Sequence, residues 1–444
     1  MLPLYLYPDK TKWLGLLQRP SLDNTSLEAS VSNILKEVKS SGDVAVKKFA
    51  SMFDKVTITN LAVTEQEIEE GIKDVSEALK IAIGQAKINI EKFHKPQLRK
   101  EEPIETMPGV LCWRKSVAIE KVGLYIPGGS APLFSTILML GIPATIAGCP
   151  EIILCSPPNR EGKLHPAVLY AANLIGIKKI YKAGGAQAIG AMAYGTQSIP
   201  QVYKIFGPGN QYVTCAKQLV QKDGLAIDMP AGPSEVAVLA NETANPAFIA
   251  ADLLSQAEHG ADSQVILITT SENIAHQVQV EVAAQLQNLS RKEIATKALE
   301  NSKIIVIRYM QEAIELVNAY AAEHLIISCE NDEEIGEQII SAGSIFLGNY
   351  SPESVGDYAS GTNHTLPTNG YARAYSGVSV DSFVKKITVQ KLTQQGIEAI
   401  GDTVETMATA EGLDAHAMAV RVRRVAGDRR QKIEDRRLEI EDRR

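Results

Sequence analysis

Two potential metal ligands, Gln256 and His259, lie three residues apart in the segment SQAEHG. The segment is predicted to end a helix, and this spacing places both side chains on one helical face, with their Cβ atoms about 5–6 Å apart. The chain contains only seven histidines among its 444 residues, so a histidine beside a second potential ligand needs a reason. If further ligands exist downstream, the pair predicts a metal site and an enzyme.

Asp357 and His416 are the candidates for the remaining ligands. Asp357 lies in a glycine-flanked loop, and His416 lies near the C-terminus. Together with Gln256 and His259 they would provide nitrogen and oxygen ligands of a kind that suits zinc or a related divalent ion. Each of these residues, taken alone, can equally be a hydrogen-bonded polar group, and their wide separation in sequence does not establish that they meet.

The adjacent residues Glu323 and His324 form a second candidate pair. They lie where a predicted helix, residues 312–322, meets a predicted strand, residues 325–328. The ends of strands are where α/β proteins place ligands. A carboxylate and an imidazole at such a junction indicate a site for proton transfer.

The other histidines are expected to play smaller parts. His364 follows Asp357 closely in sequence and is a candidate for supporting the ligands from behind. His94 and His276 lie in polar helical segments and His165 precedes a proline in a loop, so these three are expected at the surface.

The five cysteines, which include no C-x-x-C pair, are expected to be reduced thiols. Their number is odd, and a cytoplasmic location is the ordinary interpretation. Cys149 or Cys155 could serve as the nucleophile of an aldehyde-oxidising enzyme. However, Cys155 lies in an apolar run and neither has a neighbouring histidine, so both are predicted to be core residues.

Glycine-rich turns follow several predicted strands and could hold a phosphate, but no phosphate-binding motif is complete. Residues 207–212 lack the third glycine of G-x-G-x-x-G, residues 127–130 have the wrong spacing, and G-x-x-x-x-G-K-[ST] is absent. By motif alone, nucleotide binding has weak support, because such turns can simply close βα units. The connector over residues 228–235 suits a hinge, and Ser234 within it is a candidate ligand contact.

Composition indicates a globular protein of at least two domains, because single cores stop growing near about 250–300 residues. The chain is 45% hydrophobic and 22% charged, and its net charge of −7 gives no basic surface for nucleic acid or an anionic membrane. The N-terminal residues do not resemble a signal peptide. The most apolar stretch, residues 135–149, is too short to span a bilayer.

Two series of short apolar runs, separated mostly by helical segments, predict an α/β fold. Buried runs of this length favour parallel sheets made of βα units. We expect two Rossmann-like domains, doubly wound but incomplete, with a duplicated topology, although no internal repeat can be aligned. The runs are residues 122–126, 152–155, 180–183 and 204–206 in the first series, and 236–240, 265–269, 304–307, 325–328 and 345–347 in the second.

Apolar periodicity predicts helices over residues 26–53, 64–94 and 383–426, while the turn-rich residues 351–380 suit a long functional loop. The last residues, 427–444, are predicted to be a solvated charged tail. The predicted domains are an N-terminal arm without a core of its own (1–21), a discontinuous first α/β domain (22–117 and 236–375), a second α/β domain (118–235) and a helical C-terminal extension (376–444).

Seven segments together resemble the histidinol dehydrogenase family. They run in the family's order over nearly the whole chain, and only the charged tail after residue 426 is unmatched. Their combination is far more specific than any one of them. The segments are VGLYIPGGSAPL (122–133), GGAQAI (184–189), IFGPGN (205–210), IDMPAGPSE (227–235), DLLSQAEH (252–259), EHLI (323–326) and SPESVGDYASGTNH (351–364).

The resemblance implies an enzyme that oxidises L-histidinol through L-histidinaldehyde to L-histidine in two NAD-dependent steps, the last steps of histidine biosynthesis. It also implies one zinc ion per subunit and a homodimer in which Glu411 and His416 act in the partner's active site. By motif, Gln256, His259, Asp357 and His416 would bind zinc. The substrate would contact these four and Ser234, His324 and Glu411, and NAD would contact Tyr125, Gln187 and Asn210.

The same resemblance assigns proton transfer to Glu323 and His324. His324 would be the base that removes the hydroxyl proton, for which a neutral imidazole near pH 7 is suited. Glu323 would activate water on the aldehyde if burial raises its pKa. Zinc would act mainly as a template that grips the substrate's amino and imidazole groups.

Two other functions are compatible with the same residues. A zinc-dependent hydrolase that does not use NAD could employ a metal, a glutamate and a histidine, although the chain lacks H-E-x-x-H. A non-catalytic, two-lobed metal or ligand binder would retain the metal residues but would have no use for the Glu323–His324 pair. The seven matching segments favour the dehydrogenase.

Overall fold

The computed structural model describes residues 2–20, 25–128 and 132–425. The predicted charged tail and residues 129–131 of the first glycine-rich turn lie outside this part of the chain. Within it, no helix is both long and apolar enough to cross a membrane.

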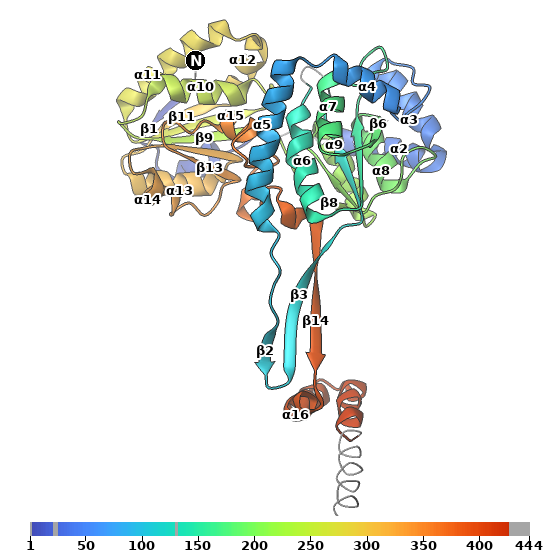
Figure 1. Ribbon diagram of the computed structural model, residues 1–444. Helices are drawn as coiled ribbons and strands as arrows, with labels where there is room; N and C mark the ends of the chain where they lie inside the picture. The colour runs from blue at the N-terminus through green and yellow to red at the C-terminus, as the bar shows by residue number, and fades with distance from the viewer. Residues whose placement is uncertain (1, 21–24, 129–131, 426–444) are drawn as a thin grey trace, which may run out of the picture. The chain divides into compact units, whose positions relative to one another are not determined.

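The chain folds into two compact units (Figure 1). The larger unit comprises Met1–Leu98 and Ala118–Phe383, and the smaller unit comprises Arg99–Val117 and Val384–Arg444. Two parallel sheets with their helices make up most of the larger unit. This confirms the predicted α/β fold class.

The first sheet of the larger unit has five parallel strands in the order β6-β5-β4-β7-β8. The chain therefore moves outward from β4 on one side and then returns to its other side, which puts a topological switch point between β4 and β7. The elements are β4 (Lys121–Tyr125), α6 (Phe134–Ala147), β5 (Glu151–Ser156), α7 (Pro166–Leu174), β6 (Lys179–Lys182), α8 (Gly185–Tyr194), β7 (Lys204–Phe206), α9 (Gln211–Lys222) and β8 (Ala226–Ile227).

The second sheet has six parallel strands in the order β1-β11-β10-β9-β12-β13. Without β1 this is the same winding as in the first sheet, so the predicted duplication of topology is confirmed. The elements are β1 (Leu4–Leu6), α1 (Trp13–Leu16), β9 (Glu235–Ala240), α10 (Pro246–Ala257), β10 (Gln264–Thr269), α11 (Glu272–Gln285), α12 (Lys292–Glu300), β11 (Lys303–Val306), α13 (Met310–Tyr320), β12 (His324–Ser328), α14 (Asp332–Gly336), β13 (Ser344–Leu347) and α15 (Glu353–Tyr358).

Both faces of the six-stranded sheet are buried, which explains why its strands are continuous apolar runs. Successive side chains of β9 alternate between two cores, as the period of a strand requires. Val236 and Val238 pack with α10, α11 and α12. Ala237 and Leu239 pack on the other face with α13 and with Leu17 of the N-terminal segment.

The N-terminal segment differs from the predicted arm without a core. β1 pairs with β11 in parallel, Leu2 is buried in one core of the six-stranded sheet and Leu17 in the other. The apolar stretch of the segment between Pro3 and Pro8 is too short to signal a strand by itself. Pairing with the exposed edge of β11 supplies the hydrogen bonds that make it one.

The predicted boundary of the first α/β domain also differs from the structure. The helix α2 (Thr25–Ser41) packs against α8 and α9 of the five-stranded sheet, α3 (Asp43–Phe49) packs against α8, and α4 (Glu65–Lys73) packs against α7. The reason is one shared apolar core, in which Leu35 and Val38 of α2 lie with Ile189 of α8. Sequence proximity assigned these helices to the wrong sheet.

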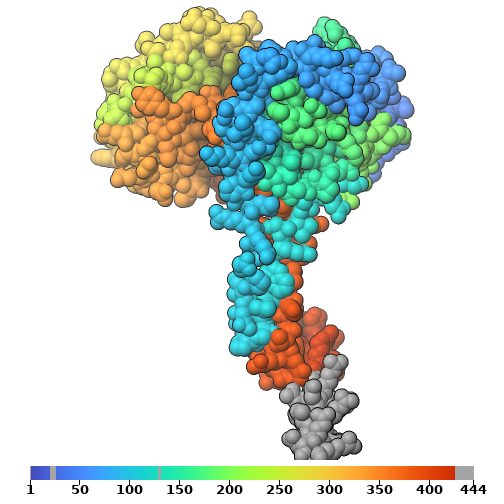
Figure 2. All heavy atoms as spheres, in the orientation of Figure 1, coloured from blue at the N-terminus to red at the C-terminus, as the bar shows by residue number. Residues whose placement is uncertain are grey.

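Helix α5 (Glu77–His94) contacts both halves of the larger unit. It packs against α6, and the side-chain amide of Asn89 donates to the main-chain oxygen of Ala359, just after α15. Figure 2 shows its atoms, in blue, between the orange residues of the six-stranded part and the green residues of the five-stranded part. The predicted helix over residues 64–94 is thus two helices, α4 and α5.

The smaller unit contains a three-stranded sheet and a helical segment. β2 (Ile104–Met107) and β3 (Val110–Ala118) form an antiparallel pair, and β14 (Val384–Leu392) adjoins β3. α16 (Gln394–Ala410) is followed by a helix over residues 414–425. The prediction of a helix over 383–426 is wrong for β14, where Ile387, Thr388 and Val389 form a β-branched run that favours a strand.

Candidate functional site

Glu323 and His324 lie at the amino edge of the six-stranded sheet. As predicted, the pair stands at a helix–strand junction, because α13 ends at Tyr320 and β12 begins at His324. Glu235 at the start of β9 lies on the neighbouring strand. Open α/β sheets usually bind ligands at their carboxyl edge, so this half of the larger unit uses the opposite edge.

Three carboxylates surround the imidazole of His324. Its Nδ1 lies 3.7 Å from Oε2 of Glu323 and 4.0 Å from Oε2 of Glu353, and its Nε2 lies 3.3 Å from Oδ1 of Asp357. Burial lowers the pKa of His324, but these carboxylates outweigh burial and raise it. These groups by themselves therefore favour the protonated imidazole, whereas the sequence led us to expect the neutral form.

The main chain of Glu235 orients both members of the pair. The N–H of Glu235 donates to Oε2 of Glu323 at 2.9 Å, and its carbonyl oxygen lies 3.3 Å from Nδ1 of His324. A carbonyl oxygen can only accept, so this contact places the hydrogen on Nδ1. Nε2 is then the nitrogen that can accept a proton, and it faces Asp357.

Several buried polar atoms of this cluster have no hydrogen-bond partner among the described residues. Such atoms are costly unless a ligand or an ion satisfies them. Two belong to the Gln256 amide in the last turn of α10, and a third is Oε2 of Glu353. Oδ1 of Asp357 and Nε2 of His324 have only each other, at 3.3 Å. The cluster thus has the unsatisfied donor and acceptor groups of a binding site.

His259, another predicted metal ligand of the larger unit, directly follows the end of α10. Its N–H donates to the main-chain oxygen of Gln256. Its side chain keeps an exposed face, yet the surrounding protein lowers the pKa of the imidazole by desolvation, with Asp357 acting in the opposite sense. A neutral imidazole is the form that binds a metal ion.

Asp357 lies on the short helix α15, not in the loop that its flanking glycines suggested. Burial favours the protonated form of its carboxyl, but His324, His364 and His259 outweigh burial and lower its pKa. His364 supports it as predicted: Nδ1 lies 2.9 Å from the main-chain oxygen of Asp357, and Nε2 lies 3.1 Å from Oγ1 of Thr136.

Glu411 and His416, the remaining predicted site residues, belong to the smaller unit. Glu411 follows α16, His416 lies on the helix over residues 414–425, and both are exposed within that unit. The other predicted ligands, Gln256, His259 and Asp357, belong to the larger unit. Within the described residues, no three His, Cys, Asp or Glu side chains are arranged to hold a metal ion.

The three residues predicted to contact NAD line one cavity of about 960 Å³ in the larger unit. Tyr125 ends β4, Gln187 lies in the first turn of α8, and Asn210 precedes α9. These positions surround the carboxyl edge of the five-stranded sheet at its switch point, where such sheets bind nucleotides. The missing third glycine of G-x-G-x-x-G therefore does not prevent the fold from forming such a cavity.

The polar groups of this cavity are partly satisfied by the turns themselves. The hydroxyl of Tyr125 accepts from the N–H of Gly185 at 3.1 Å, and Oδ1 of Asn210 accepts from two N–H groups at the start of α9. Oε1 of Gln187 is buried without a partner in the described residues and is available to a ligand.

A larger cavity, of about 1240 Å³, has Ser234 and His259 in its wall together with Asn210. It also reaches Arg19 of the N-terminal segment. The candidate substrate contact, one candidate zinc ligand and one candidate NAD contact thus face a common space.

Sequence reasoning missed two buried carboxylates of the cluster. Glu353 is buried beside His324, and its other carboxylate oxygen accepts from the hydroxyl of Ser255 at 2.7 Å. Asp252 is buried on α10, and burial raises its pKa to about 7. The available signal was the i,i+4 spacing that places Glu353 with Asp357 and Asp252 with Gln256 on common helix faces.

The structure also decides the minor predictions. Cys149 and Cys155 are buried, which confirms the prediction that both are core residues, and burial raises the pKa of both thiols. His165 and His276 are exposed as predicted. The prediction for His94 is wrong: it is fully buried at the end of α5, with Nδ1 lying 2.9 Å from the main-chain oxygen of Ile90.

The chain is similar over most of its length to known proteins of one family. The histidinol dehydrogenase family model matches residues 17–424. "Histidinol dehydrogenase" of Bacteroides fragilis is 61% identical over 420 residues, covering 95% of this chain and 98% of that protein. The protein of the same name from Yersinia pestis is 53% identical over 412 residues, covering 92% of each. A crystal structure of histidinol dehydrogenase from Elizabethkingia anophelis has 57% identity and a TM-score of 0.93, covering 95% of this chain and 98% of that one.

Proposed function

This chain belongs to the histidinol dehydrogenase family, and we propose that it oxidises L-histidinol through L-histidinaldehyde to L-histidine with two molecules of NAD. It would thereby be an oxidoreductase of histidine biosynthesis. The observation that carries the proposal is the buried Glu323–His324 pair beside unsatisfied polar atoms of Gln256 and Asp357. Proton-transfer groups and substrate-holding groups are therefore adjacent.

The residues around Asp357 suit a zinc ion. Asp357 has a lowered pKa and the pKa of His259 favours neutral imidazole. Oε1 of Gln256 is a buried carbonyl oxygen that has no hydrogen-bond partner in the described part of the chain. These donors and His416 form a set of nitrogen and oxygen ligands. When bound, zinc would hold the amino and imidazole nitrogens of histidinol.

His324 is suited to accept the hydroxyl proton in the first oxidation. Its Nδ1 is occupied by the carbonyl oxygen of Glu235, so Nε2 is the accepting atom. The proton moves to Nε2 as the carbinol carbon transfers a hydride to NAD. Proton acceptance requires a neutral imidazole, and compensation of the Asp357 charge by a bound cation would remove one of the interactions that raise the pKa of His324.

Glu323 is suited to the second oxidation. Burial raises the pKa of its carboxyl, with His324 acting in the opposite sense, and Oε2 is fixed by the N–H of Glu235. A carboxylate with a raised pKa can accept a proton from the water that adds to the aldehyde carbon. The resulting hydrate then transfers the second hydride.

We place NAD in the cavity at the switch point of the five-stranded sheet. The position of Tyr125, Gln187 and Asn210 around this cavity supports that assignment, as does the general preference of such sheets for nucleotides. NAD supplies the hydride acceptor in each step. The zinc hydrolase alternative offers no use for this cavity.

We further propose a homodimer in which Glu411 and His416 of each subunit complete the partner's site. Both residues are exposed in a small unit whose sheet and helices form a separate compact structure. A segment of this kind can extend to a second subunit at low cost. The five free cysteines support the expected cytoplasmic location, where thiols stay reduced.

A direct test is to incubate the zinc-loaded protein with L-histidinol and NAD. NADH should form and L-histidine should appear by chromatography, and a chelator should abolish both until zinc is restored. Absence of NADH would contradict the proposal. Release of product from an amide or ester substrate without NAD would favour the hydrolase.

A further inference from the structure

One ion pair next to the site has no part in the proposed chemistry and yet contacts the segments that carry Glu323 and His324. Arg19 and Glu235 form a two-pronged pair, with Nε of Arg19 donating to Oε1 at 2.8 Å and Nη2 donating to Oε2 at 2.6 Å. The side chains are 15% and 3% exposed. A buried bidentate pair is strongly directional, so it fixes the two groups that it joins.

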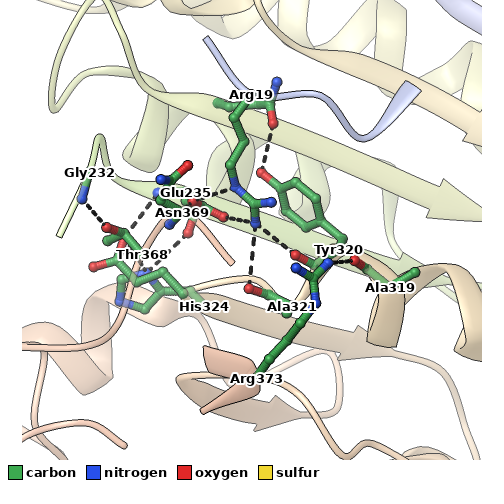
Figure 3. Close-up of polar contacts among 12 residues, drawn as sticks. Arg19, Gly232, Glu235, Ala319, Tyr320, Ala321, His324, Thr368, Asn369 and Arg373 are labelled. Carbon is green, nitrogen blue, oxygen red and sulfur yellow. Dashed lines mark hydrogen bonds and ion pairs between the residues drawn. The ribbon is translucent and has the colours of Figure 1, made fainter. Parts of the chain in front are cut away.

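Arg19 also fixes the turn that leads into the pair Glu323–His324. Its Nη2 donates to the main-chain oxygen of Tyr320 at 2.7 Å, and its guanidinium carbon lies 4.1 Å from the centre of the Tyr320 ring. Figure 3 shows the guanidinium between the Glu235 carboxylate and the carbonyls of Tyr320 and Ala321. Arg19 of the N-terminal segment thus contacts both the start of β9 and the turn between α13 and β12.

The turn needs such support because the backbone conformation of one of its residues is unfavourable. Ala321 has a φ of 55° and a ψ of 61°, the left-handed conformation that residues with a Cβ rarely adopt. It lies only two residues before Glu323. The carbonyl of Ala321 lies 3.5 Å from Nη2 of Arg19, so the guanidinium holds the carbonyls on both sides of this strained step.

The carboxylate of Glu235 ties a further segment to the same point. Its Oε1 also accepts from the N–H of Asn369, and the N–H of Gly232 donates to Oγ1 of Thr368 at 2.5 Å. The side chain of Glu235 is therefore saturated, while its main-chain N–H and carbonyl bind Glu323 and His324. Movement of Glu235 would disturb both residues at once.

We propose that Arg19 and Glu235 are positioning residues, which set the carboxylate of Glu323 and the tautomer of His324 through the main chain of Glu235 and the turn at Ala321. The inference rests on the proposed function, because it assigns these residues to proton transfer. Neither Arg19 nor Glu235 would touch the substrate. Their loss should reduce the rate of chemistry while leaving substrate binding and the metal ligands in place.

The test compares Arg19→Ala, Arg19→Lys and Glu235→Gln with Lys10→Met. Lys10 forms an exposed ion pair at 2.6 Å with Glu315 of α13, so the control removes a salt bridge between the N-terminal segment and α13, the helix that Arg19 contacts at Tyr320, without touching Glu235. We expect kcat to fall about 10- to 100-fold in Arg19→Ala and Glu235→Gln, with little change in KM for histidinol or in bound zinc. Lys10→Met should match the wild type.

Two further measurements separate positioning from a structural role. Because Arg19 lines the larger cavity, guanidinium at low millimolar concentration should partly restore kcat of Arg19→Ala, whereas the same concentration of sodium chloride should not. Arg19→Lys keeps the charge but loses the two-pronged contact, so it should remain impaired. The double variant should lose little more than either single variant, because the two residues act as a unit.

Failure of the positioning role would give a different result from failure of the proposed function. If the wild type forms no NADH from histidinol, the proposed function fails. If it does and the Arg19 and Glu235 variants keep wild-type kcat, or lose zinc and folded structure in parallel with kcat without rescue, the positioning role is contradicted. Should Arg19→Ala not fold, Glu235→Gln decides, because it keeps the shape of the side chain.

Discussion

At the residue scale, His324 contacts a different partner with each ring nitrogen. Nδ1 meets the carbonyl of Glu235 and Nε2 faces Asp357, so one nitrogen is oriented by the scaffold and the other faces the reaction. His259 has a different environment, with a lowered pKa and an exposed face. Substitution of these two histidines should therefore have different effects on the protein.

His259→Asn should lose zinc and activity together, because it removes a neutral imidazole from the proposed ligand set. His324→Asn should retain zinc while kcat falls by about 10²- to 10⁴-fold, the usual contribution of a general base. Metal analysis and initial rates on the same preparations check both statements. Zinc loss in His324→Asn would show that this residue is a ligand instead.

Glu323→Gln should separate the two oxidations. The amide retains a group that can accept from the N–H of Glu235 but cannot take a proton from water. The variant should still convert histidinol to the aldehyde and should be severely impaired with histidinaldehyde as the substrate. Equal losses with both substrates would place Glu323 in a common step.

At the scale of elements, the turn from β7 to α9 depends on a buried ion pair. Lys217 of α9 forms an ion pair with Asp228, and the side chains are 5% and 2% exposed. Nζ of Lys217 also donates to the carbonyl of Gly207, whose N–H donates to Oδ2 of Asp228. The pair therefore holds the turn that carries Asn210 into the proposed NAD cavity.

Lys217→Met should destabilise the protein by about 3–5 kcal/mol, because it leaves the Asp228 carboxylate buried without its cation. Its KM for NAD should rise more than its KM for histidinol, since the turn lies in the NAD cavity. The matched control is Lys222→Met, which removes an exposed ion pair with Glu28 from the same helix. Unchanged stability in Lys217→Met would contradict this role of the ion pair.

The elements show what the sequence could reveal. The apolar runs predicted the strands of both parallel sheets except the edge strands β1 and β8, because burial on both faces leaves a continuous signal. β14 was missed because its exposed lysines obscure the β-branched run. The helices α2 and α3 were assigned to the wrong sheet, since their amphipathic faces show that they pack but not against what.

The residues of the candidate site were likewise only partly predictable from the sequence. Gln256 and His259 were identifiable because they share one helix end, and Asp357 because its motif resembles the family's. Glu353 was passed over although it lies four residues before Asp357 on the same helix. Arg19 and Glu235, 216 residues apart, have no local pattern that joins them, and only the fold brings them together.

At the scale of the whole molecule, the proposed dimer makes a prediction about mixed subunits. The His259→Asn and His416→Asn variants should each be inactive. In the proposed dimer, however, each site takes His259 from one subunit and His416 from its partner. Subunits mixed, unfolded and refolded together should regain about one quarter of wild-type activity, because half of the dimers would be mixed and each would have one intact site.

The control mixture is His259→Asn with Glu323→Gln, assayed with histidinaldehyde. Both residues lie in the larger unit of one subunit, so every site in a mixed dimer would contain one defect and no activity should return. Recovery in neither mixture would mean that His416 acts within its own subunit, whereas full activity of His416→Asn alone would mean that it has no part in the site.

The most direct test of the central claim is the yield of NADH when a limiting amount of L-histidinol is consumed to completion. Conversion of an alcohol to a carboxylic acid releases four electrons, and each NAD accepts two as a hydride. Two oxidations in one site therefore predict about two NADH per histidinol, with L-histidine as the product. A yield of about one, with aldehyde accumulating, would contradict the account.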